Sequence, residues 1–116
     1  MEMVENLHLE RAIALKVEGN YDAAMAELRE ALLEEPESAE VHHQLGLVYG
    51  FVGEFDDSLG ALQRATDLER ENVAALNDLA KTYAMIGRYE EARAGFEKVL
   101  RLDPGNETAR QNLMFF

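Results

Sequence analysis

Apolar residues recur with helical spacing along almost the whole chain. Between residues 5 and 17 they stand three or four positions apart, which places them on one face of a helix. A single glycine, Gly19, follows, and a second helical pattern begins at Tyr21. The same order of helix, glycine and helix returns around Gly53 and again around Gly87. The pattern predicts three helix-turn-helix units, followed by a short seventh helix within residues 107–116.

The three units share a period of 34 residues. It separates the turn glycines, an aromatic residue two positions after each glycine and a small residue seven positions before it: Gly19, Gly53 and Gly87; Tyr21, Phe55 and Tyr89; Ala12, Gly46 and Ala80. A fixed period of this length is typical of stacked-repeat proteins. We expect one domain over residues 1–116, with repeats at about 5–38, 39–72 and 73–106 and a terminal partial helix at 107–116.

Residues that end or start helices fall at the expected boundaries. Glycine at each turn suits a left-handed backbone, which a side chain would oppose. Pro36 and Pro104 break the helical pattern, whereas Arg70 stands at the equivalent place in the second repeat, where we expect a less sharp break. A side chain suited to cap the next helix follows each of these positions: Ser38, Asn72 and Asn106.

The small residues in the middle of the first helices indicate a close helix crossing. Glycine is unfavourable inside a helix, so Gly46 requires a compensating contact. We expect the second helix of each unit to cross there, small residue against small residue: Ala12 with Ala24, Gly46 with Ser58, and Ala80 with Ala92.

The composition is acidic and lacks cysteine. The 116 residues include 23 Asp and Glu against 11 Lys and Arg, a net charge of −12. Such a surface repels phosphate backbones, so we expect no nucleic-acid partner. Three explanations of the acidity stay open: solubility, a basic partner, or a salt-rich cytoplasm. No run of eighteen apolar residues is present and the first residues carry acids, so we expect no membrane insertion and a cytoplasmic location.

The titratable residues do not form a recognisable catalytic or metal motif. His42 and His43 are adjacent, so on a helix they point in different directions, and His8 lies one repeat before His42. The acids Glu27, Glu30 and Glu34 are spaced as a solvated helix face. The glycines stand singly rather than in a phosphate-binding loop. We therefore expect no metal, no cofactor and no enzymatic activity.

The repeated pattern resembles the tetratricopeptide repeat. The residues that carry the resemblance are Ala12, Leu15, Gly19, Tyr21, Ala24, Leu28, Ala31 and Pro36; Leu45, Gly46, Tyr49, Gly53, Phe55, Ser58, Leu62 and Ala65; and Leu79, Ala80, Tyr83, Gly87, Tyr89, Ala92, Phe96 and Pro104. The resemblance covers almost the whole chain. It implies an all-α fold, a right-handed superhelix or solenoid of helix pairs, and a scaffold that binds a peptide or helical segment of a partner protein.

The resemblance also implies a concave groove lined by the first helix of each pair. On this chain the groove would present Asn6, Leu9, Ile13, His43, Gln44, Leu47, Phe51, Asn77, Asp78, Lys81 and Met85. We expect the polar ones, His43, Gln44, Asn77 and Lys81, to be exposed, while Ile13, Phe51 and Met85 suit either packing or ligand contact. One branch of the family clamps the acidic tails of heat-shock chaperones with lysine, asparagine and arginine. The matching positions here hold Leu9, Ile13, Gln44, Ala74 and Asp78, which argues against that ligand.

The last residues suggest an alternative function. Four of the final five side chains are apolar, and they stand where a repeat array normally ends in a polar helix: Leu113, Met114, Phe115 and Phe116. They either pack back over the third repeat, or bury against another copy, or precede further chain. The second case would make the chain a structural module that self-assembles into a homo-oligomer through this end.

Overall fold

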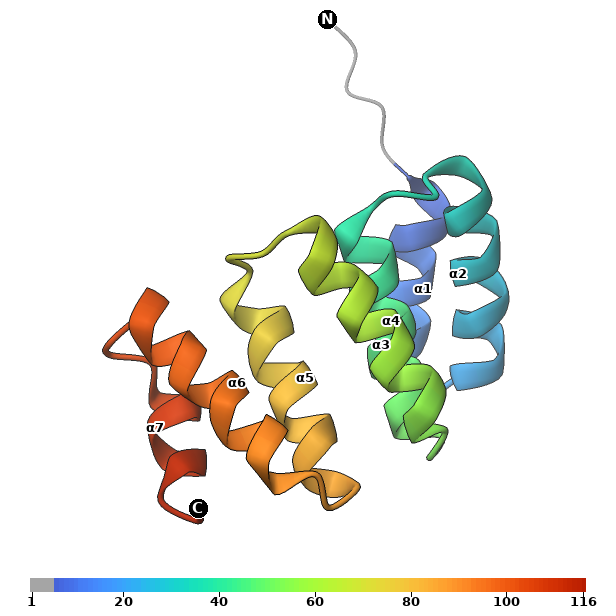
Figure 1. The fold of residues 1–116 in the computed structure, drawn as a ribbon. Coiled ribbons are helices and arrows are strands. Elements are labelled where there is room, and N and C mark those ends of the chain that lie inside the picture. The colour runs from blue at the N-terminus through green and yellow to red at the C-terminus, as the bar shows by residue number, and fades with distance from the viewer. Residues whose placement is uncertain (1–5) are drawn as a thin grey trace, which may run out of the picture.

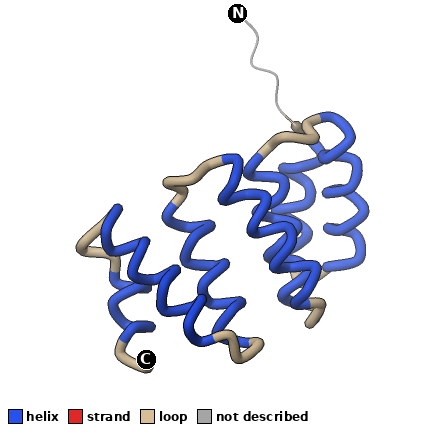
Figure 2. Tube along the Cα trace, viewed as in Figure 1, coloured by secondary structure: helices blue, strands red, loops and turns tan. Residues whose placement is uncertain are grey.

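The computed structural model describes residues 6–116, and these form seven α-helices connected by short loops. The helices are α1 (Leu7–Val17), α2 (Tyr21–Glu34), α3 (Ala39–Phe51), α4 (Phe55–Leu68), α5 (Val73–Met85), α6 (Tyr89–Leu102) and α7 (Glu107–Leu113). Helix pairs lie side by side in chain order from the blue end to the red end of Figure 1. Figure 2 shows helix and loop only in the described part of the chain. The all-α expectation is therefore confirmed.

The predicted helix ends are confirmed by their backbone geometry. Gly19, Gly53 and Gly87 have φ of 82°, 83° and 82°, in the left-handed region, so each helix pair turns in the same way. Side-chain oxygens of the next caps accept hydrogen bonds from backbone N–H groups three residues on: Ser38 from Val41 at 3.2 Å, Asn72 from Ala75 at 3.0 Å, and Asn106 from Ala109 at 3.0 Å.

Two boundary expectations need correction. The break at Arg70 is as sharp as the proline breaks, because α4 ends at Leu68 and α5 begins at Val73, in step with the neighbouring repeats. The Asn72 cap starts the new helix without help from proline. The first helix begins at Leu7 rather than at residue 5, which lies outside the described residues, and Asn6 is its N-cap, accepting from Leu9 N–H at 3.1 Å.

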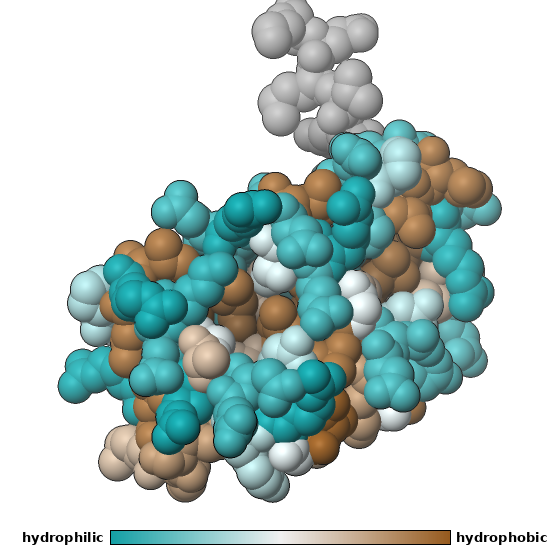
Figure 3. Space-filling model, in the orientation of Figure 1, coloured by the Kyte–Doolittle hydropathy of each residue, from teal (hydrophilic) through white to brown (hydrophobic). Residues whose placement is uncertain are grey.

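The core is a series of small buried residues interleaved with larger apolar ones. One cluster joins the first repeat to α3 and consists of Ala12, Ala24, Met25, Leu28, Ala31, Val41, Leu45 and Val48. Another joins the third repeat to α7 and consists of Leu76, Ala80, Ala92, Phe96, Val99 and Ala109. Each cluster draws on the following repeat or helix, because a single pair cannot bury both of its apolar faces. On the face shown in Figure 3, hydrophilic residues in teal surround the brown hydrophobic ones.

The close crossing in the middle repeat is confirmed, and a second contact adds to the expected one. The Ser58 hydroxyl donates a hydrogen bond of 2.7 Å to the Gly46 carbonyl, so these two residues lie together as predicted. A Cβ atom built on Gly46 would lie 2.6 Å from Cγ and 2.7 Å from Cδ2 of Leu62, so the missing side chain also makes room for this leucine. In the third repeat, a Cβ on Gly95 would lie 2.9 Å from the Ala80 Cβ, so Gly95 adjoins Ala80 at this crossing.

Replacing Gly46 with leucine should destabilise the fold by about 1–3 kcal/mol, because the new side chain would overlap the buried Leu62 and force it from its position. The matched control is Gly60→Leu in α4, where an added Cβ meets nothing within 4 Å. That variant should keep or slightly raise stability, since leucine favours the helix more than glycine does. Chemical denaturation followed by circular dichroism measures both. Equal stabilities for the two variants would rule out the close crossing.

Candidate functional site

A pocket opens between α3, α4 and α5, and we call it the central pocket. It has a volume of about 290 Å³, and its lining residues are Gly46, Leu47, Gly50, Phe51, Phe55, Ser58, Leu62, Asp78, Lys81, Thr82 and Met85. Five of the residues predicted for the groove meet here: Leu47, Phe51, Asp78, Lys81 and Met85. Phe51 is 58% exposed and Met85 is 63% exposed. Their apolar surface is available to a ligand.

These two side chains belong to a row that sequence reasoning recognised only in part. Val17, Phe51 and Met85 are 34 residues apart and stand in the last turns of α1, α3 and α5. All three are exposed, and Val17 is the most exposed at 79%. We call them the apolar row. The period that revealed the turn glycines would also have revealed Val17 as a candidate binding residue.

Three polar residues expected on the groove surface are buried, and that expectation was wrong. His43, Gln44 and Asn77 are only 7%, 8% and 6% exposed. Each has a hydrogen-bond partner in a neighbouring repeat or at the N-cap of α7, which offsets the cost of removing a polar group from water, although Asn77 Oδ1 is buried without a partner among the described residues. The bonds join His43 Nε2 to Asp78 Oδ2 at 2.7 Å, Lys16 Nζ to Gln44 Oε1 at 2.6 Å, and Asn77 Nδ2 to Asn106 Oδ1 at 3.1 Å. Lys81 is exposed, as predicted.

The predicted groove residues of the first repeat lie away from the central pocket. Asn6 is 7% exposed and donates from its side chain to the Ala31 carbonyl at 3.1 Å, so its amide joins α1 to α2. Leu9 and Ile13 are half-buried, and Leu9 packs against the first core cluster.

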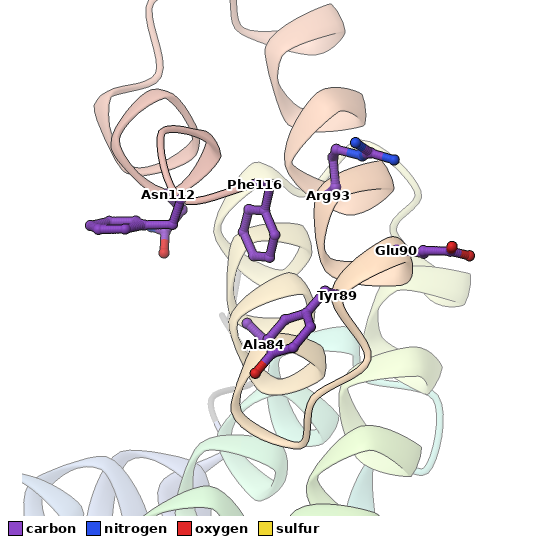
Figure 4. A pocket seen from close by; sticks show the side chains of 7 residues that line it. Ala84, Tyr89, Glu90, Arg93, Asn112 and Phe116 are labelled. Atoms are coloured by element: carbon purple, nitrogen blue, oxygen red, sulfur yellow. The ribbon is translucent and has the colours of Figure 1, made fainter.

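A second pocket lies at the end of the chain, and we call it the C-terminal pocket. It has a volume of about 630 Å³ and is lined by Ala84, Tyr89, Glu90, Arg93, Asn112, Phe115 and Phe116. Figure 4 shows that the Phe116 ring points toward the Tyr89 ring, while Glu90 and Arg93 project from α6. Sequence reasoning did not identify this pocket, because it depends on how α5, α6 and the residues at the end of the chain pack together.

The apolar end of the chain divides into a packed part and an exposed part. Leu113 packs against the third-repeat core, and the Phe116 ring centroid lies 6.0 Å from Tyr89 and 6.3 Å from Phe96. Met114 and Phe115 are 82% and 85% exposed. The four residues expected to form one assembly surface therefore do not share one environment.

The remaining histidines make structural contacts. His8 Nδ1 lies 2.5 Å from Glu27 Oε2, and His42 Nε2 donates to the Pro36 carbonyl at 2.9 Å. Within residues 6–116, no three His, Cys, Asp or Glu side chains are grouped as metal ligands. None of the helices described here is both long enough and apolar enough to cross a membrane.

Family models identify the class of protein. Two models described as tetratricopeptide repeat match residues 43–107 and 5–48. The chain therefore belongs to the tetratricopeptide repeat family, and its seven helices form three repeats followed by a partial one. A search of curated protein sequences finds no match.

Solved structures share the same fold. The first tetratricopeptide domain of Spaghetti (RPAP3), bound to an HSP90 peptide, has a TM-score of 0.90 at 21% identity, over 94% of this chain and 86% of that one. MamA has a TM-score of 0.87 at 25% identity, over 91% and 62% of the two chains. A thermophilic tetratricopeptide repeat protein of Thermus thermophilus has a TM-score of 0.77 at 32% identity, over 84% and 50%. The solenoid expectation is confirmed by these similarities.

The bond between His43 and Asp78 should be a measurable source of stability, because it joins two repeats at a largely buried position. Asp78→Ala leaves the buried imidazole without its partner and should cost about 1 kcal/mol or more. Asp67→Ala, on the exposed surface of α4, is the control and should change stability by less than about 0.5 kcal/mol. Urea denaturation of the two variants provides the comparison. If Asp78→Ala were as stable as the control, the bond between His43 and Asp78 would contribute nothing to stability.

Proposed function

We propose that this protein is a scaffold that binds a segment of a partner protein across the central pocket. The observation that carries the proposal is the exposure of Phe51 and Met85 beside a pocket of about 290 Å³. Covering apolar side chains releases about 25 cal/mol for each Å² removed from water, so a partner that fills this pocket gains affinity there. Exposed apolar surface with a polar rim is typical of interaction sites.

The polar groups of the central pocket support binding rather than catalysis. Asp78 is held by His43 at 2.7 Å and lies 3.9 Å from Lys81 Nζ, so its carboxylate already serves the contact between repeats. The surrounding walls are mostly apolar. We infer that the pocket positions an apolar side chain of the partner, while Lys81 contacts solvent or polar groups at its edge.

Proteins of similar fold bind peptides, which supports peptide binding as the general mode of recognition. Their acidic ligands, however, do not suit this chain. The RPAP3 domains were solved with HSP90 and HSP70 peptides. In the present chain, the positions that match the family's clamp for acidic tails hold Leu9, Ile13, Gln44, Ala74 and Asp78. These residues supply no cation, and Asp78 would repel an acidic tail. We propose a ligand of different chemistry.

Phe51→Glu and Met85→Glu should each abolish capture of the partner, because each removes apolar surface that the partner covers and replaces it with a carboxylate that is costly to take out of water. Both variants should keep the helicity of the parent, since both side chains are mostly exposed. Phe51 also stacks on Tyr21, so Met85→Glu is the cleaner test. Leu33→Glu, 77% exposed on α2, is the control.

The experiment is affinity capture from native lysate with the parent and the three variants, followed by mass spectrometry. The supporting result is a protein retained by the parent and by Leu33→Glu but lost from Met85→Glu. A partner captured equally well by all four would place its binding surface elsewhere.

A second candidate function is self-assembly, which the exposure of Met114 and Phe115 favours. A second copy that covered these two side chains would bury the most exposed apolar surface at this end of the solenoid. The net charge of −12 on each copy opposes this association at low salt. Any dimer should therefore strengthen as salt is added.

Light scattering over a range of protein and salt concentrations tests this second candidate. A dimer that forms at higher concentration and disappears on removal of residues 114–116 would support assembly. Met114→Ser with Phe115→Ser provides a milder variant that leaves the Phe116 contact with Tyr89 in place. A parent protein that stays monomeric at all concentrations would exclude self-assembly.

A further inference from the structure

The C-terminal pocket repeats the central pocket one repeat later. Five residues that line it stand 34 positions after residues that line the central pocket: Ala84 after Gly50, Tyr89 after Phe55, Asn112 after Asp78, Phe115 after Lys81 and Phe116 after Thr82. Both pockets lie where the end of one repeat's first helix meets the first helix of the next repeat. They are therefore two copies of one kind of site.

The equivalent place at the first junction holds a smaller pocket, of about 140 Å³, whose walls include Tyr21 and Val48. Lys16 occupies the position of Gly50 and Ala84, and its Nζ bonds to Gln44 Oε1 at 2.6 Å. The Phe51 ring stacks on Tyr21 with their centroids 5.3 Å apart. The two larger pockets are therefore at adjacent junctions, and a partner that uses both must present two apolar side chains.

The two pockets are one repeat apart, and packed helices lie roughly 8–10 Å apart. Residues seven apart on an α-helix share a face and are separated by about 10 Å along its axis. A helix lying across the repeats can therefore place one side chain in each pocket.

The buried polar residues also favour a helix over an extended peptide. An extended backbone carries N–H and C=O groups that need partners once they are covered. The amide side chains that could have provided them, Gln44 and Asn77, are buried in bonds between repeats. A helix satisfies its own backbone internally, so it can bind to an apolar surface that offers few polar groups.

The charges around the pockets complement a basic partner. The turns and the first residues of α4 and α6 carry exposed acids beside the pocket walls, at Glu54, Asp56, Asp57 and Glu90. Three cations lie near these acids but are fewer in number. Arg88 bonds to Glu91 at 2.7 Å, Lys81 lies 3.9 Å from Asp78, and Arg93 lines the C-terminal pocket. The last turns of α3 and α5 contain no basic residue, which leaves the negative ends of these helix dipoles uncompensated.

We infer that the two pockets together bind one amphipathic helix of a partner protein, with two large apolar residues seven positions apart and with lysine or arginine beside them. This inference rests on the proposed function and specifies its ligand. One apolar residue enters the central pocket next to Phe51 and Met85. The other enters the C-terminal pocket between Tyr89 and Phe115, and the basic residues face the acids of the turns.

Synthetic peptides provide the test, with binding measured by fluorescence anisotropy. The probe is a helix of about 20 residues, long enough to be helical alone, built from alanine and lysine with two leucines seven positions apart. One control places the second leucine nine positions after the first, which moves it to the opposite face of the helix. A second control replaces every lysine with glutamate. The lysine probe should bind at least about tenfold more tightly than either control.

Two protein variants test whether each pocket contributes to binding of the probe. Gly50→Leu fills the central pocket, since a Cβ at Gly50 meets only Ser58 Oγ, at an ordinary contact distance of 3.5 Å. Phe115→Ser removes one wall of the C-terminal pocket at a residue that is 85% exposed. Each variant should lower the affinity for the probe by about tenfold, which is the effect of losing one buried leucine side chain. Gly60→Leu should bind like the parent, because Gly60 has open space around it.

Equal binding of the probe and both controls, or binding that Gly50→Leu and Phe115→Ser leave unchanged, would overturn the inference. Failure of all peptides to bind would overturn it as well. The proposed function is judged separately, by whether Met85→Glu loses a partner captured from lysate. A partner that depends on Met85 while no helical peptide binds would keep the scaffold function and exclude the helical ligand.

Discussion

The three glycines with left-handed backbone set the geometry on which the rest of the structure depends. Because Gly19, Gly53 and Gly87 have nearly the same φ, every second helix leaves its turn at the same angle. Residues separated by 34 positions therefore occupy equivalent surroundings, whether they pack, cap a helix or face a ligand. The recurrence of one pocket at two successive junctions follows from this repetition of a single turn.

Polar bonds between repeats complement the apolar packing. His43, Gln44 and Asn77 would each be costly to bury alone, but each is bonded to a residue of a neighbouring repeat or of α7. Such bonds require a defined register between the two helices, because a shift of one residue would move the partner away. They also withdraw polar groups from the surface. The exposed residues beside the central pocket consequently include apolar side chains such as Phe51 and Met85.

The sequence was sufficient to predict the helices, their order and their ends, because glycines, caps and apolar spacing act over a few residues. It was misleading for His43, Gln44 and Asn77, since residue type alone does not reveal a partner that stands about one repeat away. It placed Leu47, Phe51 and Met85 on one face of the first helices but could not show that a pocket lies between them. That pocket depends on Gly50, Phe55 and Leu62, whose positions relative to α5 are set by tertiary packing.

The position shared by Lys16, Gly50 and Ala84 lies on a regular helix in each repeat. Lysine there bonds to Gln44 across the first junction, where the pocket has a volume of about 140 Å³. Glycine and alanine stand at the junctions with larger pockets, of about 290 and 630 Å³. One substitution per repeat at this position can therefore change how open a junction is. In the proposed scaffold, the surface offered to a partner would vary in this way while the turns and caps stay the same, in evolution and in protein engineering alike.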